Sequence, residues 1–143
     1  MELDDLYQEI ILDHYRNPRH AGDVSDEELL VDEENPTCGD QIRLTACVED
    51  GVVKDIRYDA RGCAISTASA SMMGEELIGK SVEQARASIA GFVALMRGEK
   101  EAELDELGDL AALEGVKQYP LRIKCATMSW HAAGLALDKL MDS

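Results

Sequence analysis

Apolar positions near the start of the chain follow the repeat of an amphipathic helix that ends at Asn17-Pro18. A residue before proline avoids the helical region of backbone space, which places the end of the helix there. The acidic cluster at 26–28 in the following stretch is interpreted as solvated surface. The positions that share one face of this helix are Leu3, Leu6, Tyr7, Ile10, Ile11 and His14.

Residues 42–60 alternate between apolar and polar side chains, which is the period of a half-buried strand. Asp50-Gly51 interrupts this alternation and is a strong signal for a two-residue hairpin turn. Together with the short apolar run at 29–31, the pattern predicts three antiparallel strands.

Helical patterns dominate the second half of the chain. One helix is predicted from Ala64 to about Ile78, and a second, capped by Ser81, covers 82–96. The acidic residues 99–109 lack a clear period and predict a mobile loop with one helical turn.

The final helix is expected from about Cys125 to Met141, after a break at Tyr119-Pro120. Strands followed by helices indicate a single α+β domain over residues 1–143. In this domain a three-stranded antiparallel sheet is expected to pack against about five helices.

Composition limits the possible functions. The 143 residues are 45% hydrophobic and 30% charged, which is typical of a globular domain. With 29 acidic and 14 basic residues, the net charge of −15 argues against nucleic acids and anionic membranes as partners. No export signal or membrane-length apolar run is visible, so a reducing cytoplasmic location is expected. There, four cysteines favour metal binding or thiol chemistry over disulfides.

Three cysteines stand in unusual sequence contexts, and two of these contexts favour a thiolate. Cys38 shares the turn sequence of residues 35–40 with Asp40. Cys63 and Cys125 each stand at the expected start of a helix, where N–H groups and the helix dipole favour negative charge. Basic neighbours in sequence, which favour the same charge state, are Arg61, Arg122 and Lys124.

These residues form a candidate four-ligand site of Cys38, Asp40, Cys63 and Cys125, suited to zinc or an iron–sulfur cluster. Spacing alone leaves open that the thiols are unrelated. The sequence has no Cys-x-x-Cys pair, and free cysteine is often a small buried hydrophobe. Cys47, on the polar side of a predicted strand, is interpreted as an incidental thiol.

Several longer motifs are spread over nearly the whole chain. They are Leu6-Tyr7, Asp13-His14-Tyr15-Arg16-Asn17-Pro18, Asn35-Pro36-Thr37-Cys38-Gly39-Asp40, Gly62-Cys63-Ala64-Ile65-Ser66, Ala68-Ser69-Ala70-Ser71-Met72-Met73 and Arg122-Ile123-Lys124-Cys125-Ala126-Thr127. In these motifs the chain resembles U-type iron–sulfur cluster assembly scaffolds. It resembles the SufU branch more than the IscU branch, because the stretch between Cys63 and Cys125 is long and Lys124 replaces a histidine typical of IscU-like proteins.

The resemblance implies a fold like that of SufE and the NifU N-terminal domain, with the four residues as ligands. It also implies Zn²⁺ in the purified protein, with iron or a 2Fe–2S cluster as the other candidate occupant, and Cys38 as acceptor of persulfide sulfur. The implied partners are a SufS-like cysteine desulfurase and downstream cluster or sulfur acceptor proteins. Two functions stay open, namely a scaffold that assembles the cluster and a zinc-dependent sulfurtransferase that relays sulfur without building one.

Residues 74–81 match the phosphate-loop pattern, but they are predicted to end a helix instead of following a strand. Glu75 and Glu76 would also repel phosphates, so no nucleotide is expected as a partner.

Two other functional classes compete with the metal site. A cysteine hydrolase would use His14, His20 or His131 as its base, but each histidine is interpreted as structural or surface. A purely structural zinc module is the other alternative, although a chain of this length can build its own core.

Overall fold

The alternating residues form a hairpin within a three-stranded antiparallel sheet. The structure is a computed structural model that describes residues 3–36, 39–99 and 108–141. Strand β2 (Asp40–Glu49) pairs with β3 (Val52–Arg61) on one side and with β1 (Val31–Asn35) on the other. Asp50 and Gly51 form the turn with φ angles of 54° and 75°, the left-handed conformation that a tight hairpin turn requires.

Strand β1 differs in position from the prediction. The apolar run at 29–31 was expected to form a strand, whereas β1 begins at Val31 and continues through the polar residues 32–35. β1 lies at the edge of the sheet, and Val31 and Asn35 are its two buried residues. Hydrophobicity therefore marks where this edge strand starts but not how far it extends.

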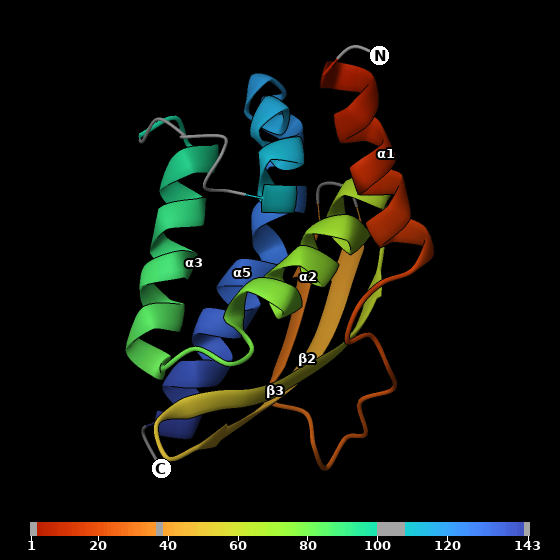
Figure 1. Ribbon diagram of the computed structural model, residues 1–143. Helices are drawn as coiled ribbons and strands as arrows, with labels where there is room; N and C mark the ends of the chain where they lie inside the picture. Colours follow the sequence, from red (N-terminus) through yellow and green to blue (C-terminus); the bar gives the residue numbers. More distant parts are fainter. Residues whose placement is uncertain (1–2, 37–38, 100–107, 142–143) are drawn as a thin grey trace.

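Helices cover one face of the sheet (Figure 1). The α+β architecture and the three antiparallel strands are as predicted. Helix α3 is capped by a reciprocal pair in which Ser81 accepts from the N–H of Gln84 and Gln84 accepts from that of Ser81. None of the described helices has the length and apolarity that a bilayer span requires. In the described residues the helices are α1 (Leu3–Arg16), α2 (Ala64–Leu77), α3 (Val82–Met96), the 3₁₀ helix η1 (Gly108–Gln118) and α5 (Pro120–Met141).

The last helix begins earlier than predicted. α5 starts at Pro120, and not at about Cys125. Proline suits the first helical position, because its φ is already helical and its missing N–H would have no intrahelical acceptor there. η1 was not predicted, and most of the loop expected at 99–109 lies outside the described residues.

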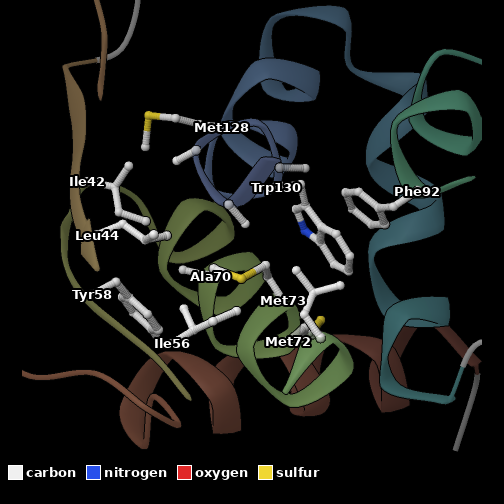
Figure 2. Packing of buried hydrophobic residues seen from close by; sticks show 14 of the residues in the cluster. Ile42, Leu44, Ile56, Tyr58, Ala70, Met72, Met73, Phe92, Met128 and Trp130 are labelled. Atoms are coloured by element: carbon white, nitrogen blue, oxygen red, sulfur yellow. The ribbon is translucent and has the colours of Figure 1, made fainter. Parts of the chain in front are cut away.

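The core lies between the sheet and the helices, where Ile42, Leu44 and Tyr58 from the strands face α2 (Figure 2). At its other end Trp130 is fully buried and stacks on Phe92, with ring centroids 4.2 Å apart. This stacking joins α5 to α3.

A hydrogen-bond chain fixes the Trp130 indole. Its Nε1–H donates to Ser69 Oγ at 3.0 Å, and Ser69 in turn donates to the carbonyl of Ala126. The Ser69→Ala variant should lower the free energy of unfolding by about 1–3 kcal/mol, because it leaves a buried indole N–H without an acceptor. Urea denaturation measures this loss. Gln8→Ala, at an exposed position on α1, should stay within about 0.5 kcal/mol of the parent protein, and an equal loss there would contradict the prediction.

Candidate metal centre

Three of the four predicted ligands come together at the N-terminal end of α2. One ligand atom each from Asp40, Cys63 and Cys125 lies within 4.8 Å of the other two. Within the ranges that the structure describes, no other group of three or more His, Cys, Asp or Glu side chains is this close. Cys38, the fourth predicted ligand, lies outside the described residues. Cys47 is exposed and does not belong to the group.

Cys63 caps helix α2. Its backbone is extended, with φ −72° and ψ 169°, and its sulfur accepts a hydrogen bond from the N–H of Ser66 at 3.4 Å. The first turn of α2 contains no acidic residue, so no carboxylate of the helix itself competes with the sulfur for the positive end of the helix dipole. This position suits a ligand that carries negative charge.

Asp40 is 1% exposed and is held by the backbone beside Cys63. Its Oδ1 accepts the N–H of Cys63 at 3.0 Å, and its Oδ2 lies 3.9 Å from the Cys63 sulfur. One carboxylate oxygen is thereby fixed by the chain, and the other faces the sulfur.

The absence of a side chain at Gly62 makes room for this carboxylate. Gly62 has a φ of 154°, and a Cβ atom there would lie 2.0 Å from Asp40 Oδ1. The sequence interpretation did not identify Gly62 as a site residue. The available signal was its position, because it is a glycine directly before a candidate ligand and a helix start.

Cys125 is buried in the second turn of α5, so the predicted helix-start effect does not apply to it. Arg122, three residues earlier on the same helix, supplies positive charge instead. The neighbouring Cys63 thiol raises the pKa of the Arg122 guanidinium, and a hydrogen bond with Cys125 acts in the same direction. Arg122 therefore interacts with both sulfurs.

The other two basic neighbours point elsewhere. The Arg61 side chain is 79% exposed and lies 3.9 Å from Asp59. Lys124 is exposed and lines a cavity of about 490 Å³ between α5 and β1. Of the three bases predicted from the sequence, Arg122 is the one that hydrogen-bonds with the site sulfurs.

The donor set fits zinc better than a hard cation. Two sulfurs and one carboxylate are the donor types found in tetrahedral zinc sites, whereas magnesium and calcium take oxygen ligands. Cys38, two residues before Asp40 in the sequence, supplies a fourth donor of the same kind in the predicted set.

His14 forms the hydrogen-bond pattern of a hydrolase triad without the exposure that catalysis needs. Its Nδ1 lies 2.6 Å from Ser71 Oγ, and its Nε2 lies 2.8 Å from a carboxylate oxygen of Asp109. Ser71 is fully buried inside α2, and its Oγ already accepts the N–H of Arg19 at 2.9 Å. The trio ties together α1, α2 and η1, which agrees with the structural role expected for His14.

The phosphate-loop motif has the structural context predicted from the sequence. Gly74 lies within α2, where a Cβ would approach the His20 ring at 3.0 Å. Gly79 follows the end of α2, and Ser81 caps α3. No strand leads into the motif, so it lacks the strand–loop–helix arrangement that binds phosphates. The third histidine, His131, lines the cavity beside α5, and partial burial there lowers its pKa.

Comparisons with known proteins identify the family of this chain. Residues 6–126 match the NifU-like N-terminal domain family. The zinc-dependent sulfurtransferase SufU of Bacillus subtilis (strain 168) is 47% identical over 130 residues, covering 91% of this chain and 88% of the relative. The iron–sulfur cluster assembly scaffold protein IscU of Streptococcus pyogenes serotype M1 is 40% identical, covering 96% and 86%.

A solved structure gives the same assignment. It is described as a putative iron–sulfur cluster assembly scaffold protein for the SUF system from Fervidobacterium islandicum AW-1. The TM-score is 0.81 at 29% identity, with 95% of this chain and 99% of that chain covered. From these matches, the chain belongs to the NifU-like N-terminal domain family and, within it, is similar to SufU and IscU proteins.

Proposed function

We propose that this chain is an iron–sulfur cluster assembly scaffold that binds zinc and accepts persulfide sulfur from a cysteine desulfurase. The convergence of Asp40, Cys63 and Cys125 within 4.8 Å is the observation that carries this proposal. The names of the relatives support it, because one is a zinc-dependent sulfurtransferase and another is a scaffold protein.

Cys38, Asp40, Cys63 and Cys125 are the residues that would hold the ion. Zinc, when bound, keeps sulfur ligands deprotonated at neutral pH and offsets part of their negative charge. The protein contributes the fixed Asp40 carboxylate, the capping position of Cys63 and the Arg122 guanidinium. Together they order the donors before an ion arrives.

Cys38 is the residue that we assign as sulfur acceptor. The other two thiols of the predicted ligand set have structural positions of their own, because Cys125 is buried and Cys63 caps α2. The Cys38 thiolate attacks the outer sulfur of the donor's persulfide. The donor's sulfur–sulfur bond breaks, the donor cysteine leaves as a thiolate, and Cys38 carries the new persulfide.

A narrower alternative is a sulfurtransferase that relays sulfur without assembling a cluster. Lys124 favours this alternative, because a lysine directly before Cys125 offers no imidazole ligand. Its side chain lines the cavity and does not belong to the metal centre.

Metal analysis and sulfur uptake test the proposal together. Freshly purified protein should contain about one zinc per chain, and it should gain sulfur when mixed with a cysteine desulfurase and cysteine. Elemental analysis, an optical spectrum and intact mass measure these quantities. After incubation with iron, desulfurase and cysteine, protein that gains iron, sulfide and a brown colour supports cluster assembly, and protein that gains sulfur but keeps zinc and stays colourless supports the relay. Protein that holds neither metal and takes up no sulfur would contradict the proposal.

A further inference from the structure

Two large apolar side chains are exposed at the beginning of α5. Tyr119 is 63% exposed and Leu121 is 77% exposed, more than any other large apolar residue of the described chain. They flank Pro120, the first residue of the helix. Exposed apolar side chains grouped in this way, beside a functional centre, are typical of a contact surface for another protein.

The backbone holds these two side chains in an ordered segment. The N–H of Tyr119 donates to the Val116 carbonyl at 2.9 Å, and the Tyr119 carbonyl accepts the N–H of Arg122 at 2.8 Å. A partner that binds here meets side chains on a fixed backbone, so association costs less conformational entropy than ordering a loose loop.

Basic side chains without carboxylate partners lie beside them. Within the described ranges, neither Arg122 nor Lys124 forms a salt bridge with a carboxylate, although the protein has a net charge of −15. Most other bases are paired with acids. The paired bases are Arg19, Arg43, Arg57, Arg61, Lys80, Arg86 and Lys117.

The surface is continuous with the metal centre on one side and with a cavity on the other. Arg122 interacts with the sulfurs of Cys63 and Cys125. Pro120 and Lys124 line the cavity of about 490 Å³, whose opposite wall is formed by β1. A protein that contacts Arg122 at this surface therefore lies beside the site sulfurs.

We propose that Tyr119, Leu121, Arg122 and Lys124, which we name the α5 start surface, dock the protein that donates persulfide sulfur. The partner face that fits is an apolar recess bordered by carboxylates, because it would meet two apolar side chains and two cations without carboxylate partners. We assign the donor to this surface because the surface lies beside the metal centre. Sulfur transfer requires the donor sulfur to come within about 3–3.5 Å of the acceptor thiol. This inference rests on the proposed function.

At the α5 start surface, the charge expected of the partner is opposite to the charge expected from the composition of this protein. A net charge of −15 favours a basic partner at long range, whereas contact at this surface favours an acidic one. Long-range attraction and local contact therefore involve different regions of the donor.

The main test is a double variant, Tyr119→Ser with Leu121→Ser. Its dissociation constant for a cysteine desulfurase should rise by about tenfold or more, since truncated apolar anchors at interfaces commonly have effects of this size. The matched control is Tyr15→Ser with Leu135→Ser, because these side chains are 45% and 44% exposed, the first on α1 and the second farther along α5. Leu135 follows Leu121 by about 20 Å along α5. Calorimetric titration should show unchanged affinity for the control.

Two charge-reversal variants test whether the partner face at the α5 start surface is acidic. Lys124→Glu and Lys54→Glu change the net charge equally, but Lys54 lies on β3, outside the α5 start surface. Weaker binding by Lys124→Glu alone is the expected result, with zinc content unchanged in both proteins. Equal effects of the two variants would overturn the local docking proposal.

Sulfur uptake separates this inference from the proposed function. One outcome supports both the docking surface and the proposed function. In it the parent protein takes up sulfur, and the double variant needs more donor to reach half of an unchanged maximal rate. If the parent takes up sulfur and the double variant binds the donor with parental affinity, the docking surface is wrong and the proposed function stands. If the parent takes up no sulfur, the proposed function itself fails.

Discussion

The Cys38→Ala protein should take up no persulfide sulfur from a cysteine desulfurase above the background of the assay. Persulfide transfer needs a thiolate nucleophile, and alanine has no sulfur to receive the transferred atom. Intact mass spectrometry after incubation with desulfurase and cysteine measures the uptake. Proteolysis of the parent protein should place the added sulfur on the peptide that contains Cys38.

Cys47→Ala is the matched control for this experiment. Cys47 is an exposed thiol outside the metal centre, so its removal should leave the rate and extent of sulfur uptake unchanged. Normal uptake by Cys38→Ala would show that another thiol accepts the sulfur. Loss of uptake in Cys47→Ala would likewise contradict the assignment of Cys38 as the acceptor.

Gly62→Ala should weaken zinc binding by about 10–100-fold, the range found when groups that position metal ligands are changed. The new Cβ would lie 2.0 Å from Asp40 Oδ1 and 2.7 Å from its Cγ, so the carboxylate must move. Asp40 is 1% exposed, and displacement also breaks its hydrogen bond with the N–H of Cys63. Competition with a chromophoric chelator measures the zinc affinity.

Gly79→Ala separates this collision from simple backbone strain. Gly79 also has a positive φ, 93°, but a Cβ there would meet nothing within 4 Å. Both variants should lose stability, because alanine disfavours such a conformation. Zinc affinity should fall in Gly62→Ala and stay at the parental value in Gly79→Ala. Parental affinity in both proteins would mean that the Asp40 carboxylate relocates without cost.

Local patterns predict those elements that carry a clear hydrophobic period or a residue typical of a turn, a cap or a helix end. The hairpin of β2 and β3, the capped start of α3 and the end of α1 near Asn17-Pro18 were all predicted on this basis. The polar edge strand β1 and the 3₁₀ helix η1 have weaker patterns, since tertiary contacts and not periodicity determine them. Pro120 was interpreted as a break, but it is also the first residue of α5.

The candidate site shows the same division between local and tertiary information. The capping position of Cys63 was predicted from its place before a helical pattern, and the structure has it there. The distance between Cys63 and Cys125 depends on how α5 packs beside α2, which spacing in the sequence does not give. The close approach of Gly62 to Asp40 is likewise visible once the strands and α2 are placed together.

The three described donors come from β2, from the cap of α2 and from the second turn of α5, so the centre is complete only after α5 has been synthesised. A nascent chain on the ribosome that ends before Cys125 carries Asp40 and Cys63 without the third donor. Synthesis must extend into α5 and past the exit tunnel before all three donors can meet. Metal insertion that uses all three donors is therefore expected only after this part of α5 has emerged from the ribosome.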